Sequence, residues 1–194
     1  MPSDLVGWID QPEQIRILAS PVRQEIVDTL SVSGACTVAT LAHELGVSAD
    51  SLYYHLRKLT ASGLVVEDTS RQEARYRLPS GPIAFRYTLS DPENVEAVGD
   101  AIASMLRMTN RDFRSALQDK SAVVEGKGRT LWASRVRAWL SDEDVTEINA
   151  LLHQLYEICS RPRREEATNL CALTWVLAPL EPQPIRRESK SATT

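Results

Sequence analysis

Hydrogen-bonding and cationic side chains gather on one side of residues 48–62. If this segment is an α-helix of about 100° per residue, Leu52, Leu56 and Leu59 fall within roughly 40° of one another. The polar and charged side chains of Tyr54 and Arg57 then lie on the opposite side. Such a face can hydrogen-bond to base edges in a DNA groove and pair with phosphates. The chemistry that this segment indicates is therefore non-covalent recognition of a nucleic acid.

Covalent chemistry is not indicated anywhere along the chain. No nucleophile, base and orienting residue stand at a recognisable spacing, and no glycine-rich phosphate loop follows an expected strand. We therefore expect a protein that is not an enzyme and that needs no cofactor.

Two short helices joined by a tight turn would position this face. Ser48 is a suitable N-cap for the second helix, and Asp50 places negative charge in its first turn. Upstream, residues 37–45 read as a helix that ends at Gly46, where glycine tolerates a positive φ. This spacing predicts a helix-turn-helix, whose second helix would enter the major groove.

A β-hairpin is expected next. Residues 64–68 and 74–78 are strand-like runs separated by a polar segment. In the second run Tyr76 shares one face with Leu78, whereas Arg75 and Arg77 share the other. The hairpin would form a basic wing beside the second helix.

Three segments resemble the arsenic-repressor (ArsR) family of bacterial transcription regulators. They are residues 18–30, 41–48 and 52–65, and the resemblance covers roughly residues 12–80. It implies a winged helix-turn-helix that binds double-stranded DNA as a homodimer, in the bacterial cytoplasm. Tyr53 stands where a small polar residue is common in the family, which bears on base preference and not on docking.

The residues expected to contact DNA come from the second helix and the wing. They are Ser48, Asp50, Ser51, Tyr53, Tyr54, Arg57, Lys58, Arg71, Arg75 and Arg77. The formal net charge of −4 does not oppose this expectation, because affinity depends on the local field over the contacted phosphates.

Composition and cysteine usage set outer limits. The 194 residues, 43% hydrophobic and 25% charged, are ordinary for a globular protein. We expect no signal peptide and no membrane contact, because no apolar run approaches the roughly 20 residues that span a bilayer. Cys36, Cys159 and Cys171 form no CxxC pair, and the histidines are isolated, so no metal site is expected.

Residues 92–119 predict a long helix, after a proline-containing boundary near residue 80. Its large apolar side chains recur at steps of three and four, the pattern of a helix packing lengthwise on another helix. We expect this stripe to form a homodimer interface, and the alternative is packing on the C-terminal segment of the same chain. The stripe comprises Val95, Val98, Ile102, Met105, Leu106 and Phe113.

The C-terminal region reads as a small β-α-β unit. Strands are expected at 130–140 and 169–180, on either side of a helix from Ser141 to about Ser160. An alternative role is a pocket for an unidentified small-molecule effector, because aromatic side chains often line such sites. Its candidate residues are Trp132, Trp139, Tyr156 and Trp175.

These expectations combine into one architecture. The fold class is mainly α (α+β), with a winged helix-turn-helix at 12–80, a linker and long dimerisation helix at 81–120, the β-α-β region at 121–180 and a disordered tail at 181–194. The leading interpretation is a homodimeric, sequence-specific DNA-binding regulator that acts as a repressor. The rival interpretation is a winged-helix module that docks another protein, because one fold serves both uses.

Overall fold

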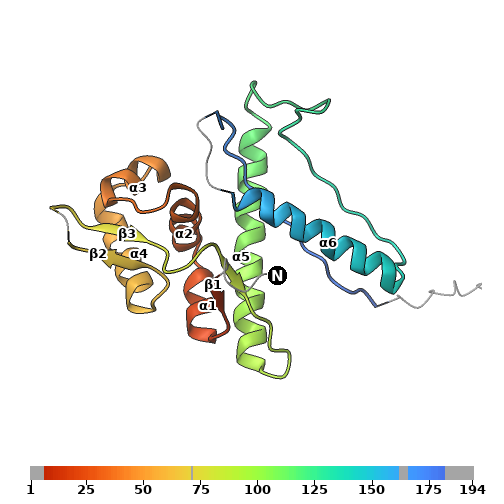
Figure 1. The fold of residues 1–194 in the computed structure, drawn as a ribbon, viewed down its shortest axis with the longest axis horizontal. Helices are drawn as coiled ribbons and strands as arrows, with labels where there is room; N and C mark the ends of the chain where they lie inside the picture. Colours follow the sequence, from red (N-terminus) through yellow and green to blue (C-terminus); the bar gives the residue numbers. More distant parts are fainter. Residues whose placement is uncertain (1–6, 71, 162–165, 182–194) are drawn as a thin grey trace, which may run out of the picture.

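The computed structural model describes residues 7–70, 72–161 and 166–181. Within these ranges the chain is mainly α-helical, as predicted, and it contains two small sheets. The elements are β1 (Gly7–Ile9), α1 (Pro12–Leu18), α2 (Pro21–Ser33), α3 (Val38–Leu45), α4 (Ala49–Ala61), β2 (Val66–Asp68), β3 (Arg75–Arg77), β4 (Ile83–Phe85), α5 (Pro92–Ala116) and α6 (Asp142–Cys159). Figure 1 shows α3, α4 and the β2–β3 hairpin at one end of the molecule and α6 at the other, with α5 between them.

The predicted hairpin is present and is joined to the helices. β2 and β3 pair antiparallel, with Glu67 opposite Tyr76. Tyr76 also pairs with Cys36, in the loop between α2 and α3, through two backbone hydrogen bonds of 2.9 and 2.7 Å. Because the hairpin is bonded to this loop, the wing has a fixed position beside the helix-turn-helix.

A second sheet was not predicted. β1 and β4 pair in parallel, with Gly7 opposite Ile83 and Ile9 opposite Phe85. Each strand has only three residues, too few for a period of two to stand out in the sequence. This sheet ties the segment before α1 to the segment before α5.

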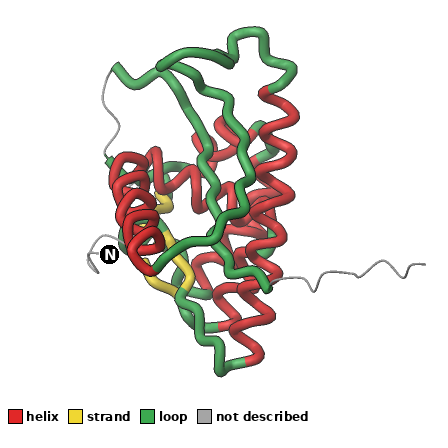
Figure 2. The backbone as a smooth tube through the Cα atoms, turned by 90° about the vertical axis from the view of Figure 1, so that its right-hand side faces the viewer, coloured by secondary structure: helices red, strands yellow, loops and turns green. Residues whose placement is uncertain are grey.

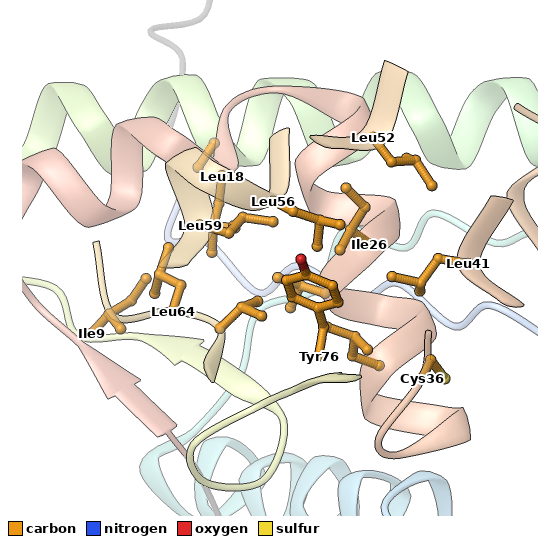
Figure 3. Packing of buried hydrophobic residues seen from close by; sticks show 14 of the residues in the cluster. Ile9, Leu18, Ile26, Cys36, Leu41, Leu52, Leu56, Leu59, Leu64 and Tyr76 are labelled. Atoms are coloured by element: carbon orange, nitrogen blue, oxygen red, sulfur yellow. The ribbon is translucent and has the colours of Figure 1, made fainter. Parts of the chain in front are cut away.

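The core lies between α1, α2, α4 and the wing. Leu52, Leu56 and Leu59 of α4 are almost completely buried, as the helical wheel predicted. Figure 3 shows the Tyr76 ring pointing from the wing into the same cluster, near Leu56 and Ile26. Replacing one of these leucines by alanine would typically cost about 2–5 kcal/mol of stability.

The long helix α5 packs on α1 through small side chains. Its buried positions are Asn94, Ala97, Ala101, Ser104 and Met108. They recur at steps of three and four, and the small residues among them permit close approach of the two helices. The predicted stripe of large apolar residues lies roughly a third of a turn further round the helix, where Val95 and Leu106 are exposed. The helix ends at Ala116, a few residues before the expected end.

The predicted C-terminal β-α-β unit is wrong in its strands. The helix is present as α6, with Ser141 as N-cap and a reciprocal capping box with Asp144. The flanking segments 130–140 and 169–180 are not strands in the described chain, and Figure 2 shows both as loop. Their apolar sequences favour extended backbone, but a strand also needs a partner strand, and within the described part of the chain the only backbone hydrogen bonds of these segments are those of residues 130 and 131 to Val123.

No described residue from 117 to 181 is buried. Large apolar side chains are open to solvent here, with Trp139 at 90% and Leu170 at 86% exposure. One point of contact with α5 exists, since the hydroxyls of Thr109 and Thr174 lie 2.8 Å apart. The expected tail from 182 onward lies outside the described residues.

Candidate nucleic-acid interface

The turn between α3 and α4 has the geometry predicted for a helix-turn-helix. α3 begins at Thr37, whose Oγ1 accepts a 3.2 Å hydrogen bond from the backbone N–H of Thr40. It ends at Gly46, whose φ of 66° and ψ of 30° are left-handed. The backbone N–H of Val47 then donates to the carbonyl of Ala42 at 3.1 Å, and this bond closes the turn.

Ser48 is the N-cap of α4, as predicted. Its Oγ accepts a 3.4 Å hydrogen bond from the backbone N–H of Ser51. The Ser51 hydroxyl in turn donates to the carbonyl of Ser48 at 2.7 Å. With Asp50 in the first turn, the start of α4 is defined by local interactions that were visible in the sequence.

The opposite end of α4 is held by a residue that sequence reasoning missed. Gln14 of α1 donates from Nε2 to the carbonyl of Ser62, the C-cap of α4, at 2.8 Å. The two residues are 48 positions apart, so no local pattern could have identified the pair. α1 therefore fixes the last turn of the helix whose first turn Ser48 defines.

The outward face of α4 carries the predicted recognition residues. Tyr53 and Tyr54 are 48% and 53% exposed, and Asp50, Arg57 and Lys58 are also exposed. Arg57 has no side-chain hydrogen bond or ion pair with any described residue. Its guanidinium group is thus available to a partner outside the chain.

Tyr54 is held between two neighbours. The Lys58 Nζ lies 5.5 Å from the centre of the Tyr54 ring, a cation–π contact. On its other side the His55 ring meets Tyr54 edge to face, with centroids 5.3 Å apart. These contacts restrict the Tyr54 ring and leave its hydroxyl exposed to solvent.

His55 is half-buried at the boundary between the two faces of α4. Burial, and then the positive charge of Arg23, lower the pKa of this imidazole. His55 is therefore neutral at pH 7, and its part here is to brace Tyr54 by ring packing.

The wing presents its arginines away from the core. Because Tyr76 points inward, Arg75 and Arg77 on either side of it point outward, half-buried and exposed respectively. The Tyr76 hydroxyl donates to Glu67 at 2.8 Å, and burial followed by this hydrogen bond raises the pKa of Tyr76 to about 12. Arg71, the third predicted wing residue, lies outside the described residues.

The four aromatic residues of the predicted effector pocket are at least partly exposed. Trp132, Trp139 and Trp175 are 66%, 90% and 36% exposed, and Tyr156 is half-buried. The guanidinium of Arg129 lies 3.2 Å from the centre of the Trp132 ring, so this ring carries a cation on one face. The pocket stays a prediction.

Potential metal ligands are scattered among the described residues. No group of three or more histidine, cysteine, aspartate or glutamate side chains there could hold a metal ion. Cys36 is buried, whereas Cys159 and Cys171 are exposed, and all three are free thiols. No described helix is both long enough and apolar enough to cross a membrane.

Comparison with known proteins agrees with this geometry. Residues 18–68 match the model of a helix-turn-helix domain family, a span that contains α2, α3, α4 and β2. The chain thus contains a helix-turn-helix, of the class that DNA-binding transcription regulators use. No curated protein matches it significantly.

Similarity to solved structures is present but low. One is described as a "possible transcriptional regulator for arsenical resistance", with 28% identity, coverage of 52% of this chain and 95% of that chain, and a TM-score of 0.33. A second is the YusO protein from Bacillus subtilis, with 13% identity, coverage of 76% and 84%, and a TM-score of 0.31. A third is a multiple antibiotic-resistance repressor (MarR) from Listeria monocytogenes, with 13% identity, coverage of 77% and 83%, and a TM-score of 0.29.

Proposed function

We propose that this chain is a sequence-specific DNA-binding transcription regulator that acts as a homodimer and represses. The observation that carries the proposal is the outward face of α4. Tyr54, Arg57 and Lys58 lie there together, exposed, on a helix whose two ends are fixed by Ser48 and Gln14. A rigid helix with an open polar face is the element that reads base edges in the major groove.

The contacts divide into two kinds. Arg57 is suited to a bidentate hydrogen bond with a guanine, and the braced Tyr54 offers a ring and a hydroxyl to neighbouring bases. The wing arginines Arg75 and Arg77 are suited to phosphates, which position a protein without reading sequence. Specificity would then come from α4 and much of the affinity from the wing.

The homodimer is proposed on the stripe of α5. Val95 and Leu106 are 46% and 47% exposed, and the neighbouring apolar residues Ile102, Met105 and Phe113 are only half-buried. Pairing two such helices would place two copies of α4 on successive turns of DNA, about 10 base pairs apart centre to centre or a multiple of that. The repressor role and the bacterial cytoplasm rest on the resemblance to the arsenic-repressor family.

A second function is supported by the same face. Tyr53 and Tyr54 are exposed aromatic residues, a type enriched in protein–protein interfaces. A winged-helix module that docks another protein would use them without DNA. The salt dependence of retention on immobilised random DNA separates the two functions, because only phosphate contacts release counterions.

The decisive experiment selects bound duplexes from a random library. We expect the parent protein to enrich a sequence of two related half-sites, and Arg57→Ala to lose the enrichment at one position in each half-site. Arg107→Ala, an exposed arginine of α5 away from this face, is the matched control and should enrich the parental sequence. Failure of the parent protein to enrich any sequence would refute DNA recognition by α4.

A further inference from the structure

Residues 117–161 and 166–181, called the arm here, expose more apolar surface than a folded chain normally leaves open. The arm contains α6 and the two extended runs 132–140 and 167–180. Its exposed large apolar side chains are Leu117, Val123, Val124, Trp132, Val136, Trp139, Leu140, Val145, Leu151, Leu155, Ile158, Leu170, Leu173, Trp175, Val176, Leu177 and Leu180. A set of this size marks a surface that something covers.

The accessible surface area of the chain indicates how much surface a partner of the arm would cover. It amounts to 14981 Å², whereas a compact monomer of this mass exposes about 9,200 Å². When the residues outside the described ranges are credited with the surface of an unfolded chain and the described residues are compared with a compact chain of their own mass, roughly 2,700 Å² remains in excess. A dimer that removed half of that excess from each copy would bury in total about 2,700 Å², which is within the range of obligate homodimers.

The backbone of the arm is also without partners. In the described part of the chain, no backbone hydrogen bond involves residues 132–140 or 167–180. Extended runs rich in tryptophan, valine and leucine, with free N–H and C=O groups, are templates for pairing with another chain. Apart from the contacts of Trp132 with Arg129 and of Thr174 with Thr109, little in the described part of the chain holds these runs in place.

Charge favours a second copy of the same chain as the partner. Arg135 and Arg137 of the first run are exposed and have no acidic partner among the described residues. The start of α6 carries Asp142 and Glu143, which likewise have no basic partner there. An arm that presents both signs is complementary to itself, as an interface related by two-fold symmetry requires.

We propose that the arm is a homodimer interface, in which a second copy of this chain covers its apolar side chains and bonds to the backbone of residues 132–140 and 167–180. The proposal rests on the homodimer of the proposed function and goes beyond it, since that homodimer was placed on α5 alone. It also gives the exposed tryptophans a role in assembly in place of a role in an effector pocket.

The test combines two substitutions with a matched control. In the single chain Trp139 and Leu170 are almost fully exposed, so Trp139→Asp and Leu170→Asp remove no contact from the monomer. We expect each to raise the dimer dissociation constant at least tenfold in analytical ultracentrifugation of the full chain. Leu89→Asp, at an 87% exposed leucine in the loop before α5, should leave it unchanged. Equal dissociation constants for all four proteins would overturn the proposal.

Hydrogen exchange of the parent protein gives an independent readout. At a concentration where it is dimeric, the amides of residues 132–140 and 167–180 should exchange at least a hundredfold more slowly than in an unstructured peptide. Exchange at the unprotected rate in a dimer would overturn the proposal and leave a dimer through α5 intact. Protection that persists in a monomer would overturn it too, since the arm would then be held by its own chain. Loss of the library enrichment described above, with a protected arm, would refute DNA recognition and not the arm interface.

Discussion

The side chain of Asn94, in the first turns of α5, donates a 2.8 Å hydrogen bond to the backbone carbonyl of Asp10, 84 residues earlier. The same Nδ2 reaches the carbonyl of Arg86 at 3.3 Å, and Oδ1 accepts from the backbone N–H of Thr88 at 2.8 Å. Asn94 is only 1% exposed, and the three bonds are partly buried. One side chain thus joins the ends of β1 and β4 to α5.

Removing this side chain should destabilise the protein strongly. Asn94→Ala leaves three backbone groups without their partner in a partly buried place, and a fully buried group of this kind costs about 1–3 kcal/mol. We expect a loss of at least 2 kcal/mol in the free energy of unfolding, measured by urea denaturation. Asn149→Ala, at an exposed asparagine of α6 whose bond is local, should change it by less than about 0.5 kcal/mol. Similar losses in the two variants would contradict the role assigned to Asn94.

The turn of the helix-turn-helix depends on the left-handed conformation of Gly46. A Cβ there would meet no atom within 4 Å, so Gly46→Ala tests the backbone alone. We expect a loss of about 1 kcal/mol, because an L-residue pays roughly 1–2 kcal/mol for a left-handed conformation. Gly99→Ala, inside α5 with equal space and no positive φ, should instead stabilise by about 0.5–1 kcal/mol. Thermal unfolding at one protein concentration measures both changes in stability. A gain in stability for Gly46→Ala would contradict the left-handed conformation of this residue.

Substitutions at α4 and at the wing should weaken DNA binding in different ways. Arg57→Ala should cost about 1–3 kcal/mol on the selected sequence and little on random DNA, since it removes a base contact. Arg77→Ala should weaken binding to both and lower the slope of log affinity against log salt by about 1. Titrations by fluorescence anisotropy at several salt concentrations measure these effects. Equal losses on both kinds of DNA for Arg57→Ala would assign it to phosphate contact.

A charge on the α5 stripe should oppose dimerisation. Ile102→Glu would bury a carboxylate in the proposed interface, so we expect monomer at micromolar concentration and weaker operator binding with it. Ala103→Glu places the same charge on an exposed position about 100° further round the helix and should remain dimeric. Light scattering distinguishes the two. If both variants remain dimeric, the dimer interface does not lie on this stripe.

Chelation should have no effect. Soft and borderline ions need about four clustered donors, and Cys36 is buried in the N-terminal domain, whereas Cys159 and Cys171 are exposed in the arm. We expect the melting temperature and operator affinity to be equal with and without EDTA, and zinc or arsenite not to release DNA. Stoichiometric zinc in the purified protein, lost together with DNA binding, would show a site assembled between copies.

The helix-turn-helix was predictable because its signals are local. The end of α3 is set by Gly46 and the start of α4 by Ser48, and the buried face of α4 is set by its own leucines. The β1–β4 sheet and the Gln14–Ser62 bond were not predictable, because their partners are separated by tens of residues. The candidate recognition face followed from the same local periodicity that gave the helix.

One omission and one error have a common physical origin. On α5 the sequence pattern drew attention to large residues such as Ile102 as a dimer interface, and the packing on α1 through Ala97 and Ala101 was missed, because alanines weigh little in hydropathy. In the arm the apolar runs predicted strands, but a strand exists only with a partner, which this chain does not supply within the described residues. Which side chains are buried and which segments pair as strands are properties of the assembled fold and not of a segment.

The bond from Gln14 to Ser62 has a mechanical consequence. α1 packs along α5 and also bonds to the last turn of α4, so α1 connects α5 to the recognition helix. In a dimer built on α5, the separation of the two recognition helices would therefore be a rigid dimension of the protein. Operators whose half-sites differ from that spacing would have to bend or twist to fit, and the deformability of the DNA between them would become part of what is recognised.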